Sequence, residues 1–364
     1  MSIFRRLYRG ETNFDFVGTR RRWYLASLII VVICVLSFVF RGFNWGIEFK
    51  GGSQFQINAA NSSITAKQAE TAFSNAGIQA ADAARIVGSG STRQIVVKTQ
   101  HTTPAQQESA TAKVTQELGL PSNSVSVMSV SSSWGHDITV KALQGLIVFL
   151  IVVSIYLSIR FQWRMAVGAF IALIHDLVVA AGIYSLVGFE ISPSTVVGLL
   201  TILGFSLYDT VVVYDKVAEN SKDILAGSRM TFSEAANLAV NQTLMRSINT
   251  SIIALLPVAG LLFVGAGILG VGTIKDLALI LFVGLASGAY SSLFLATPIV
   301  CDLTERQPAY KALAKRVAAK RASEAAKLAT SEPALAGAGV TPRRTSGPAP
   351  APRPGARPQR ARRR

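Results

Sequence analysis

The stretch VVGLLTILGFSLYDTVVV, residues 196–213, is a mainly apolar run that carries one acidic residue, Asp209. Its 18 residues are enough to cross a bilayer as a helix. A carboxylate at that depth costs about 2.5–3.5 kcal/mol on insertion scales, so an acid that is kept there usually has a function. The run therefore predicts a transmembrane helix with a functional acid.

Five further apolar segments surround this run. Half of the 364 residues are hydrophobic and the mean hydropathy is +0.40, whereas the formal net charge is +16. An ordinary soluble domain does not combine these properties, so apolar and basic residues must lie in different segments. We expect a polytopic α-helical membrane protein. A window of about 19 residues selects six transmembrane helices: residues 23–40, 142–159, 165–187, 196–213, 247–265 and 277–300.

The first apolar segment follows three arginines, Arg20 to Arg22, as the core of a cleavable signal peptide would. It is longer than a typical signal core, and residues 41–45 (RGFNW) contain no small-x-small cleavage site. We therefore interpret residues 1–22 as a cytoplasmic N-terminus and residues 23–40 as the first transmembrane helix.

Basic residues predict the orientation, because cytoplasmic loops carry an excess of Lys and Arg. The N-terminus, the loop 160–164 and the loop 215–246 contain such residues, whereas the segment 188–195 has none and is expected outside. Residues 142–300 then form helices two to six around the cytoplasmic loop 215–246. Both termini are expected in the cytoplasm.

The C-terminal tail, residues 301–364, is expected to be basic and largely disordered. Residues 306–364 hold 15 Lys and Arg against two acidic residues, and the composition from about Ser331 onward is rich in Ala, Pro and Arg. Such a tail can bind anionic lipid or the RNA of a ribosome through its positive charge. It can also be a solvated tail that only fixes the topology.

Residues 44–137 are expected to form an extracytoplasmic α+β domain between the first two spans. The predicted order is β-α-β-β-α-β, as in ferredoxin-like domains. Neither a cluster of metal ligands nor a nucleophile motif occurs in it, which favours binding or force transmission over enzymatic catalysis. The strands are predicted at 53–58, 85–87, 93–99 and 124–130, and the helices at 65–76 and 104–118.

Two ionisable pairs stand out in the later spans. His175 and Asp176 are adjacent in the third span, and side chains of neighbouring helical residues point about 100° apart, so they do not easily serve one narrow site. A contact between helices and direct proton handling both remain open for them. Removal from water favours the neutral form of Asp209, which would let it load and release a proton. Arg246 cannot lose its charge, so we expect it to influence Asp209.

Several of these stretches resemble the SecF branch of the SecD/SecF family of protein-export membrane subunits, within the resistance-nodulation-division superfamily. GIEFKGGS, residues 46–53, resembles the family signature G-I-D-F-x-G-G and contains Gly46, Gly51 and Gly52. By itself it is a turn that leads into the first strand. The His175-Asp176 pair resembles the third-span motif.

The longest similarity is LTILGFSLYDTVVVYDKVAEN, residues 200–220, to the pattern G-Y-S-[LI]-N-D-T-[VI]-V-V-[FS]-D-R-[IV]-R-E-N. This match includes Gly204, Asp209 and Asp215, although Asp215 by itself would be a solvated helix end. NQTLMRSINTS, residues 241–251, is similar to the start of the family's fifth span. Tyr208 departs from the pattern, since many members have Asn there.

The resemblance implies that Asp209 is the coupling aspartate and Arg246 the membrane arginine of the family. It implies a proton-driven accessory subunit of the Sec translocase, in the bacterial cytoplasmic membrane, with no cofactor or metal other than the coupling proton. The implied partners are SecD, the SecYEG channel, exported preproteins and YajC. A proton-coupled small-molecule carrier and a membrane scaffold without coupling remain as alternatives.

Overall fold

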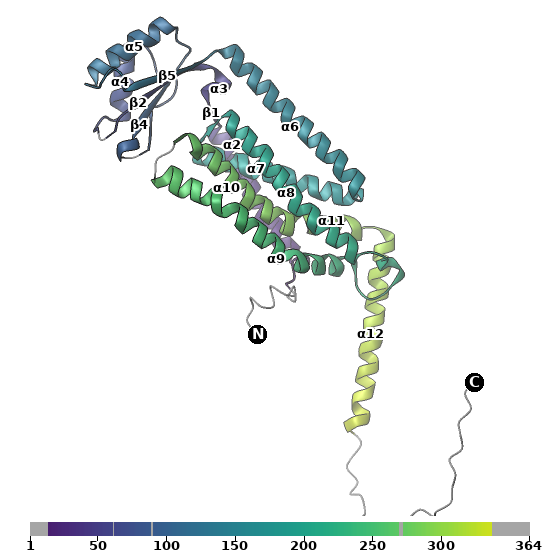
Figure 1. Cartoon of the computed structure of the whole chain (residues 1–364). Coiled ribbons are helices and arrows are strands. Elements are labelled where there is room, and N and C mark those ends of the chain that lie inside the picture. Colours follow the sequence, from purple (N-terminus) through teal and green to yellow (C-terminus); the bar gives the residue numbers. More distant parts are fainter. Residues whose placement is uncertain (1–13, 61, 89, 269–271, 337–364) are drawn as a thin grey trace, which may run out of the picture. The chain divides into compact units, whose positions relative to one another are not determined.

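The structure is a computed structural model that describes residues 14–60, 62–88, 90–268 and 272–336. Within those residues six helices are long and apolar enough to cross a membrane, which confirms the six predicted spans. They lie side by side as a bundle (Figure 1). The helices are α2 (Arg20–Arg41), α6 (Ser132–Arg160), α7 (Trp163–Val187), α8 (Pro193–Asn220), α9 (Phe232–Ala259), and the run of α10 (Gly272–Ser291), η4 (Ser292–Ala296) and α11 (Thr297–Glu305).

Helices α8 and α9 continue into the predicted cytoplasmic loop 215–246, α8 as far as Asn220 and α9 from Phe232. The start of α9 is fixed by a capping box. The Thr231 side chain accepts a hydrogen bond from the backbone N–H of Glu234, and the Glu234 side chain accepts one from the N–H of Thr231. The remaining loop contains the short helix η2 (Ile224–Ala226).

Small residues let α8 and α10 pack closely. A Cβ atom on Gly284 would overlap the Ile202 side chain, and one on Gly288 would lie 2.8 Å from the Cβ of Ser206. Gly284 and Gly288 are four residues apart, the spacing that membrane helices use for close contact because lipid provides no hydrophobic drive for association. The contact at Ser206 lies about one helical turn from Asp209.

Two segments have the wider π-helical turn, η3 (Gly260–Ile268) and η4. At η4 the cause is Pro298, which has no N–H to donate and whose ring clashes with the carbonyl four residues earlier, that of Phe294. The Ala296 carbonyl in the same segment accepts a hydrogen bond from the Tyr214 hydroxyl at 3.3 Å. A side chain of α8 thus stabilises the widened turn.

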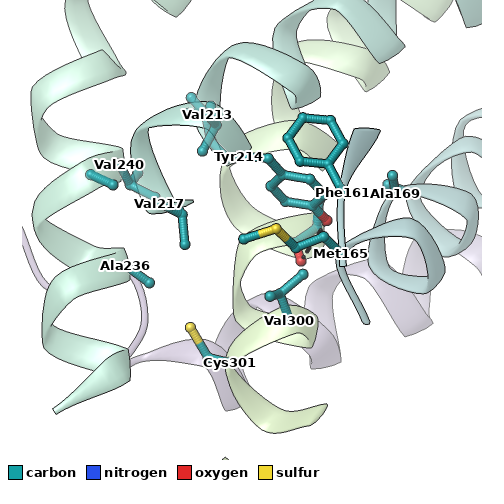
Figure 2. Packing of buried hydrophobic residues seen from close by; sticks show 14 of the residues in the cluster. Phe161, Met165, Ala169, Val213, Tyr214, Val217, Ala236, Val240, Val300 and Cys301 are labelled. Carbon is teal, nitrogen blue, oxygen red and sulfur yellow. Dashed lines mark hydrogen bonds between the residues drawn. The ribbon is translucent and has the colours of Figure 1, made fainter. Parts of the chain in front are cut away.

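A buried apolar cluster holds α11 against α7, α8 and α9 (Figure 2). At its centre the fully buried Tyr214 ring packs edge-to-face on Phe161, with ring centroids 5.8 Å apart. Val300 and Cys301 of α11 lie in the same cluster. The position of η4 is therefore fixed by the hydrogen bond from Tyr214 and by the packing of α11, which follows it.

The residues between α2 and α6 form an antiparallel sheet with two helices packed on it. The strand order is β3-β4-β2-β5. Phe55, Ile95, Phe73 and Val114 are buried between sheet and helices. The elements are β2 (Gly52–Asn58), α4 (Ala66–Asn75), β3 (Arg85–Val87), β4 (Gln94–Thr99), α5 (Pro104–Glu117) and β5 (Val125–Val130), with a short η1 (Gly90–Thr92).

Helix α6 begins at Ser132, before the predicted end of the extracytoplasmic domain at residue 137. The Ser131 hydroxyl accepts a hydrogen bond from the backbone N–H of Trp134 and so caps the helix. A serine cap placed before the apolar run extends the helix by about ten residues beyond the hydropathy signal, which begins at residue 142.

Part of the tail that is predicted to be largely disordered, residues 301–364, is helical: α11 continues to Glu305, and α12 spans Pro308–Ala336. Residues 309–327 are rich in Ala, Lys and Arg and contain no Gly or Pro, so their intrinsic helix propensity is high. From Ala318 onward the chain forms a second unit. Residues 337–364 lie outside the described part, as do residues 1–13 of the predicted N-terminus.

We expect Gly284→Ala to destabilise the protein by about 1–3 kcal/mol, because the added methyl group overpacks against Ile202, which is buried. The matched control is Gly145→Ala in α6, where nothing lies within 4 Å of the added atom. Thermal unfolding in detergent measures the difference. Equal melting temperatures for the two variants would contradict a tight α8–α10 contact.

Candidate functional site

Asp209 lies inside the bundle on α8, with 4% of its surface exposed. Its Oδ1 accepts a hydrogen bond from the hydroxyl of Ser247 in α9 at 2.7 Å, and its Oδ2 accepts one from Ser292 in η4 at 2.5 Å. The carboxylate therefore connects three segments of the bundle through hydroxyl donors.

Asp176 on α7 is a second buried acid, only 1% exposed. Its Oδ2 accepts hydrogen bonds from Ser206 of α8 at 2.6 Å and from Ser291 of α10 at 2.7 Å. Its Oδ1 accepts one from Ser287 of α10 at 2.7 Å. Each carboxylate is thus surrounded by serine hydroxyls that come from neighbouring helices.

His175 contacts Asp176 directly, with 3.2 Å between its Nδ1 and the Asp176 Oδ1. His175 therefore reaches its neighbour although adjacent helical side chains point about 100° apart. Its Nε2 is buried and has no hydrogen-bond partner among the described residues. The imidazole ring lies 6.0 Å from the ring of Tyr290.

No Lys or Arg of the described residues forms an ion pair with Asp176 or Asp209. A carboxylate only accepts hydrogen bonds, whereas a protonated acid also donates one, and a serine hydroxyl can do either. Rotation of the hydroxyls can satisfy both protonation states, which an ammonium or guanidinium group cannot do. The arrangement is therefore chemically suited to taking up and releasing protons.

Arg246 lies apart from this polar interior. Its side chain is exposed on α9, and its Nη2 donates a hydrogen bond to the Tyr208 hydroxyl at 3.0 Å. The guanidinium carbon lies 6.0 Å from the Tyr208 ring centroid. The structure does not bring Arg246 into an ion pair with Asp209; it places the arginine and Tyr208 together on the outer surface of the bundle.

The glycines of residues 46–53 allow backbone conformations and close backbone contacts that a side chain would hinder. Gly51 and Gly52 have φ of 76° and 135°, and a Cβ on Gly52 would lie 2.6 Å from the Thr99 carbonyl oxygen. The N–H of Gly46 donates to the Ile191 carbonyl at 2.8 Å, beside a parallel pairing of β1 (Asn44–Trp45) with β6 (Glu190–Ile191). The motif thus joins the end of α2 to the loop between α7 and α8.

A second charged cluster lies beside this motif. Lys98 Nζ and Glu190 Oε1 form an ion pair at 2.6 Å, with the lysine side chain 8% exposed. Burial raises the pKa of Glu48, on α3 (Ile47–Lys50), above its ordinary value, and the Glu190 charge raises it further while Lys98 opposes both. These residues line a cavity of about 520 Å³.

The other two motif residues have simple environments. Asp215 forms an exposed ion pair with Arg160 at 2.7 Å, at the end of α8. Gly204 is exposed, and a Cβ there would meet nothing within 4 Å, so neither packing nor backbone geometry within this chain requires a glycine.

Sequence reasoning missed the serines that surround the acids: Ser247, Ser287, Ser291 and Ser292. Ser287 and Ser291 are four residues apart in an apolar span and so share one helix face, which is a recognisable signal. That they meet the acids of α7 and α8 depends on the packing of α10, which the sequence pattern does not specify.

Family models match most of the transmembrane region. The model for "Protein export membrane protein SecD/SecF, C-terminal" matches residues 110–306, and that for the "SecD/SecF GG Motif" matches residues 36–62. The chain is 48% identical over 329 residues to a protein translocase subunit SecF of Streptomyces coelicolor, covering 90% of this chain and 87% of the relative. It is 44% identical over 333 residues to the SecF of Mycobacterium tuberculosis, covering 88% and 74%.

A solved structure has the same fold. The crystal structure of SecDF, a translocon-associated membrane protein from Thermus thermophilus, superimposes with a TM-score of 0.71 at 29% identity, covering 81% of this chain and 39% of that one. These relatives, the two family models and the shared fold agree. The chain belongs to the SecD/SecF family of protein-export membrane proteins.

Proposed function

We propose that this chain is an accessory subunit of the Sec translocase that uses the proton-motive force, together with SecD, to promote late steps of protein translocation. The observation that carries the coupling part is Asp209, a buried acid held by hydroxyl groups and without a cationic partner among the described residues. Membership of the family supports the export part.

The available energy is sufficient for such a role. One elementary charge that moves through 100 mV provides about 2.3 kcal/mol. That free energy changes an equilibrium constant about 50-fold, so a single proton can bias a conformational equilibrium substantially. Because the Asp209 carboxylate bonds to α9 and η4, its protonation changes the contacts between helices.

His175 and Asp176 act in this proposal as a proton relay beside Asp209. Both are buried, and the free Nε2 of His175 can bind a proton or a water molecule. Arg246 also takes part in coupling in this proposal. It acts through its contact with Tyr208 and through a partner subunit, and not through an ion pair inside this chain. A pseudo-symmetric partner is typical of transporters in which one chain supplies half of the helices.

SecD is the partner that the relatives favour, since a Thermus thermophilus relative carries both names in one chain, SecDF. We further propose contacts with the SecYEG channel, exported preproteins and YajC. The basic tail is proposed to bind anionic lipid or the ribosome. The location is the bacterial cytoplasmic membrane with both termini inside, and residues 44–137 form a ferredoxin-like domain on the outer side.

Replacing the coupling acid tests the function. We expect Asp209→Asn to abolish the gradient-dependent part of protein export into inverted membrane vesicles, because an amide cannot exchange a proton, while SecD still co-purifies. The matched control is Asp223→Asn, in the exposed loop after α8, which should export like the parent. Export that stays gradient-dependent in Asp209→Asn would favour a scaffold, and altered drug accumulation on deletion would favour a small-molecule carrier.

Cysteine labelling tests the orientation. In intact spheroplasts a membrane-impermeant maleimide should label Ser74→Cys, on the exposed face of α4, and should label Lys222→Cys only after permeabilisation. The native Cys34 and Cys301 are 3% and 0% exposed, so they give little background. The reverse labelling pattern would contradict the proposed topology.

A further inference from the structure

Two adjacent residues serve two different acids. The Ser291 hydroxyl donates to Asp176 at 2.7 Å, and the Ser292 hydroxyl donates to Asp209 at 2.5 Å. We propose that Ser291 and Ser292 couple Asp176 and Asp209 into one proton-binding centre, in which protonation of either acid changes the protonation equilibrium of the other. The inference rests on the proposed function, because it needs acids that exchange protons.

Each of the two hydroxyls has a second acceptor within its own helix. Ser291 Oγ lies 3.3 Å from the Gly288 carbonyl oxygen, and Ser292 Oγ lies 3.2 Å from that of Ala289. A serine has one hydroxyl hydrogen, so it donates either to the acid or to this carbonyl. When an acid is protonated, it can donate to the serine oxygen, and the serine hydrogen turns to the carbonyl.

The two serines lie where the backbone can respond to this change. Ser291 is the last residue of α10, and Ser292 is the first residue of the widened turn η4. Single widened turns inside helices are frequent at functional sites, because their hydrogen bonding is irregular. When one serine changes its hydrogen-bond partner, a backbone carbonyl in this turn gains or loses a hydrogen bond. The other serine lies in the same turn and is therefore affected.

A second connection runs through α8. Ser206, which donates to Asp176, is three residues before Asp209, and its backbone carbonyl accepts a hydrogen bond from the Thr210 hydroxyl at 3.0 Å. Gly288 permits the close approach of α10 to Ser206. Asp176 is thus held to α8 three residues before Asp209, and to α10 at the residue next to the Ser292 donor of Asp209.

The other titratable groups around the two acids are few among the described residues. His175 on α7 contacts Asp176, and Tyr290 on α10 lies beside the His175 ring. On α8 the Tyr214 hydroxyl donates to the Ala296 carbonyl. On α9 Arg246 binds Tyr208. The most direct link between the acids is therefore this pair of adjacent serines, of which Ser291 donates to Asp176 and Ser292 donates to Asp209.

The test is a double-mutant cycle on the full-length protein in lipid vesicles. Infrared absorption of protonated carboxyl groups, assigned by isotope-labelled aspartate and by subtraction of the Asp209→Asn spectrum, gives the pH at which Asp209 is half protonated. We expect this midpoint to differ by about one pH unit between the parent and Asp176→Asn, the size typical of coupled sites. With Ser291→Ala and Ser292→Ala both present, the same comparison should give a clearly smaller difference, because only the connection through Ser206 remains.

The controls are Ser287→Ala and Ser247→Ala, which each remove one hydroxyl donor from one acid only. They should move individual midpoints and keep the coupling between the acids. Coupling of undiminished size in the double serine variant would overturn the inference, because direct charge repulsion would then explain it. If the double variant does not fold, Ser292→Ala alone carries the same comparison, since Ser291 and Ser247 keep their bonds.

Failure of the inference and failure of the proposed function give different results. A midpoint for Asp209 that is the same with Asp or Asn at position 176 refutes the coupling and leaves Asp209 as an independent proton carrier. An Asp209 that shows no protonated form across the accessible pH range refutes the proton-driven function, and the coupling with it.

Discussion

The structure depends on placing two carboxylates in a membrane-embedded bundle where no Lys or Arg of the described residues pairs with them. Burial of an unpaired charge is costly, and a carboxylate surrounded by apolar side chains alone would be strongly destabilising. Here five serine hydroxyls from four segments, α8, α9, α10 and η4, donate to Asp176 and Asp209. Because the donors come from different helices, the hydrogen bonds of the two acids form only when these helices pack together.

Close packing makes these hydrogen bonds possible. A serine side chain is short, so its hydroxyl reaches a carboxylate on the next helix only when the two backbones approach closely. Gly284 and Gly288 provide that approach between α10 and α8. The apolar cluster around Tyr214 then holds the adjoining segment η4–α11 in place. Polar satisfaction, glycine spacing and apolar packing therefore support one another within a few helical turns.

Much of this organisation can be predicted from the sequence, because a bilayer restricts the possible structures. Hydropathy predicts all six helices, and the rarity of acids in apolar runs singles out Asp176 and Asp209. Helix ends are less predictable, since caps such as Ser131 and Thr231 extend helices beyond their apolar part. Partners across helices are not predictable from pattern at all. The sequence predicts that Arg246 influences Asp209, and it does not predict the contact with Tyr208 that Arg246 makes on the outer face of α9.

The widened turn before Pro298 also decides which side of α11 faces inward. A π-helical turn accommodates roughly one more residue than an α-helical turn, and one residue corresponds to about 100° of rotation around the axis. Val300 and Cys301 reach the interior only because that offset precedes them. If residues 292–296 formed a regular α-helical turn without losing a residue, these two side chains would be rotated by about 100° away from their places in the apolar cluster. The wider turn thus takes up one extra residue and keeps Val300 and Cys301 inside the bundle.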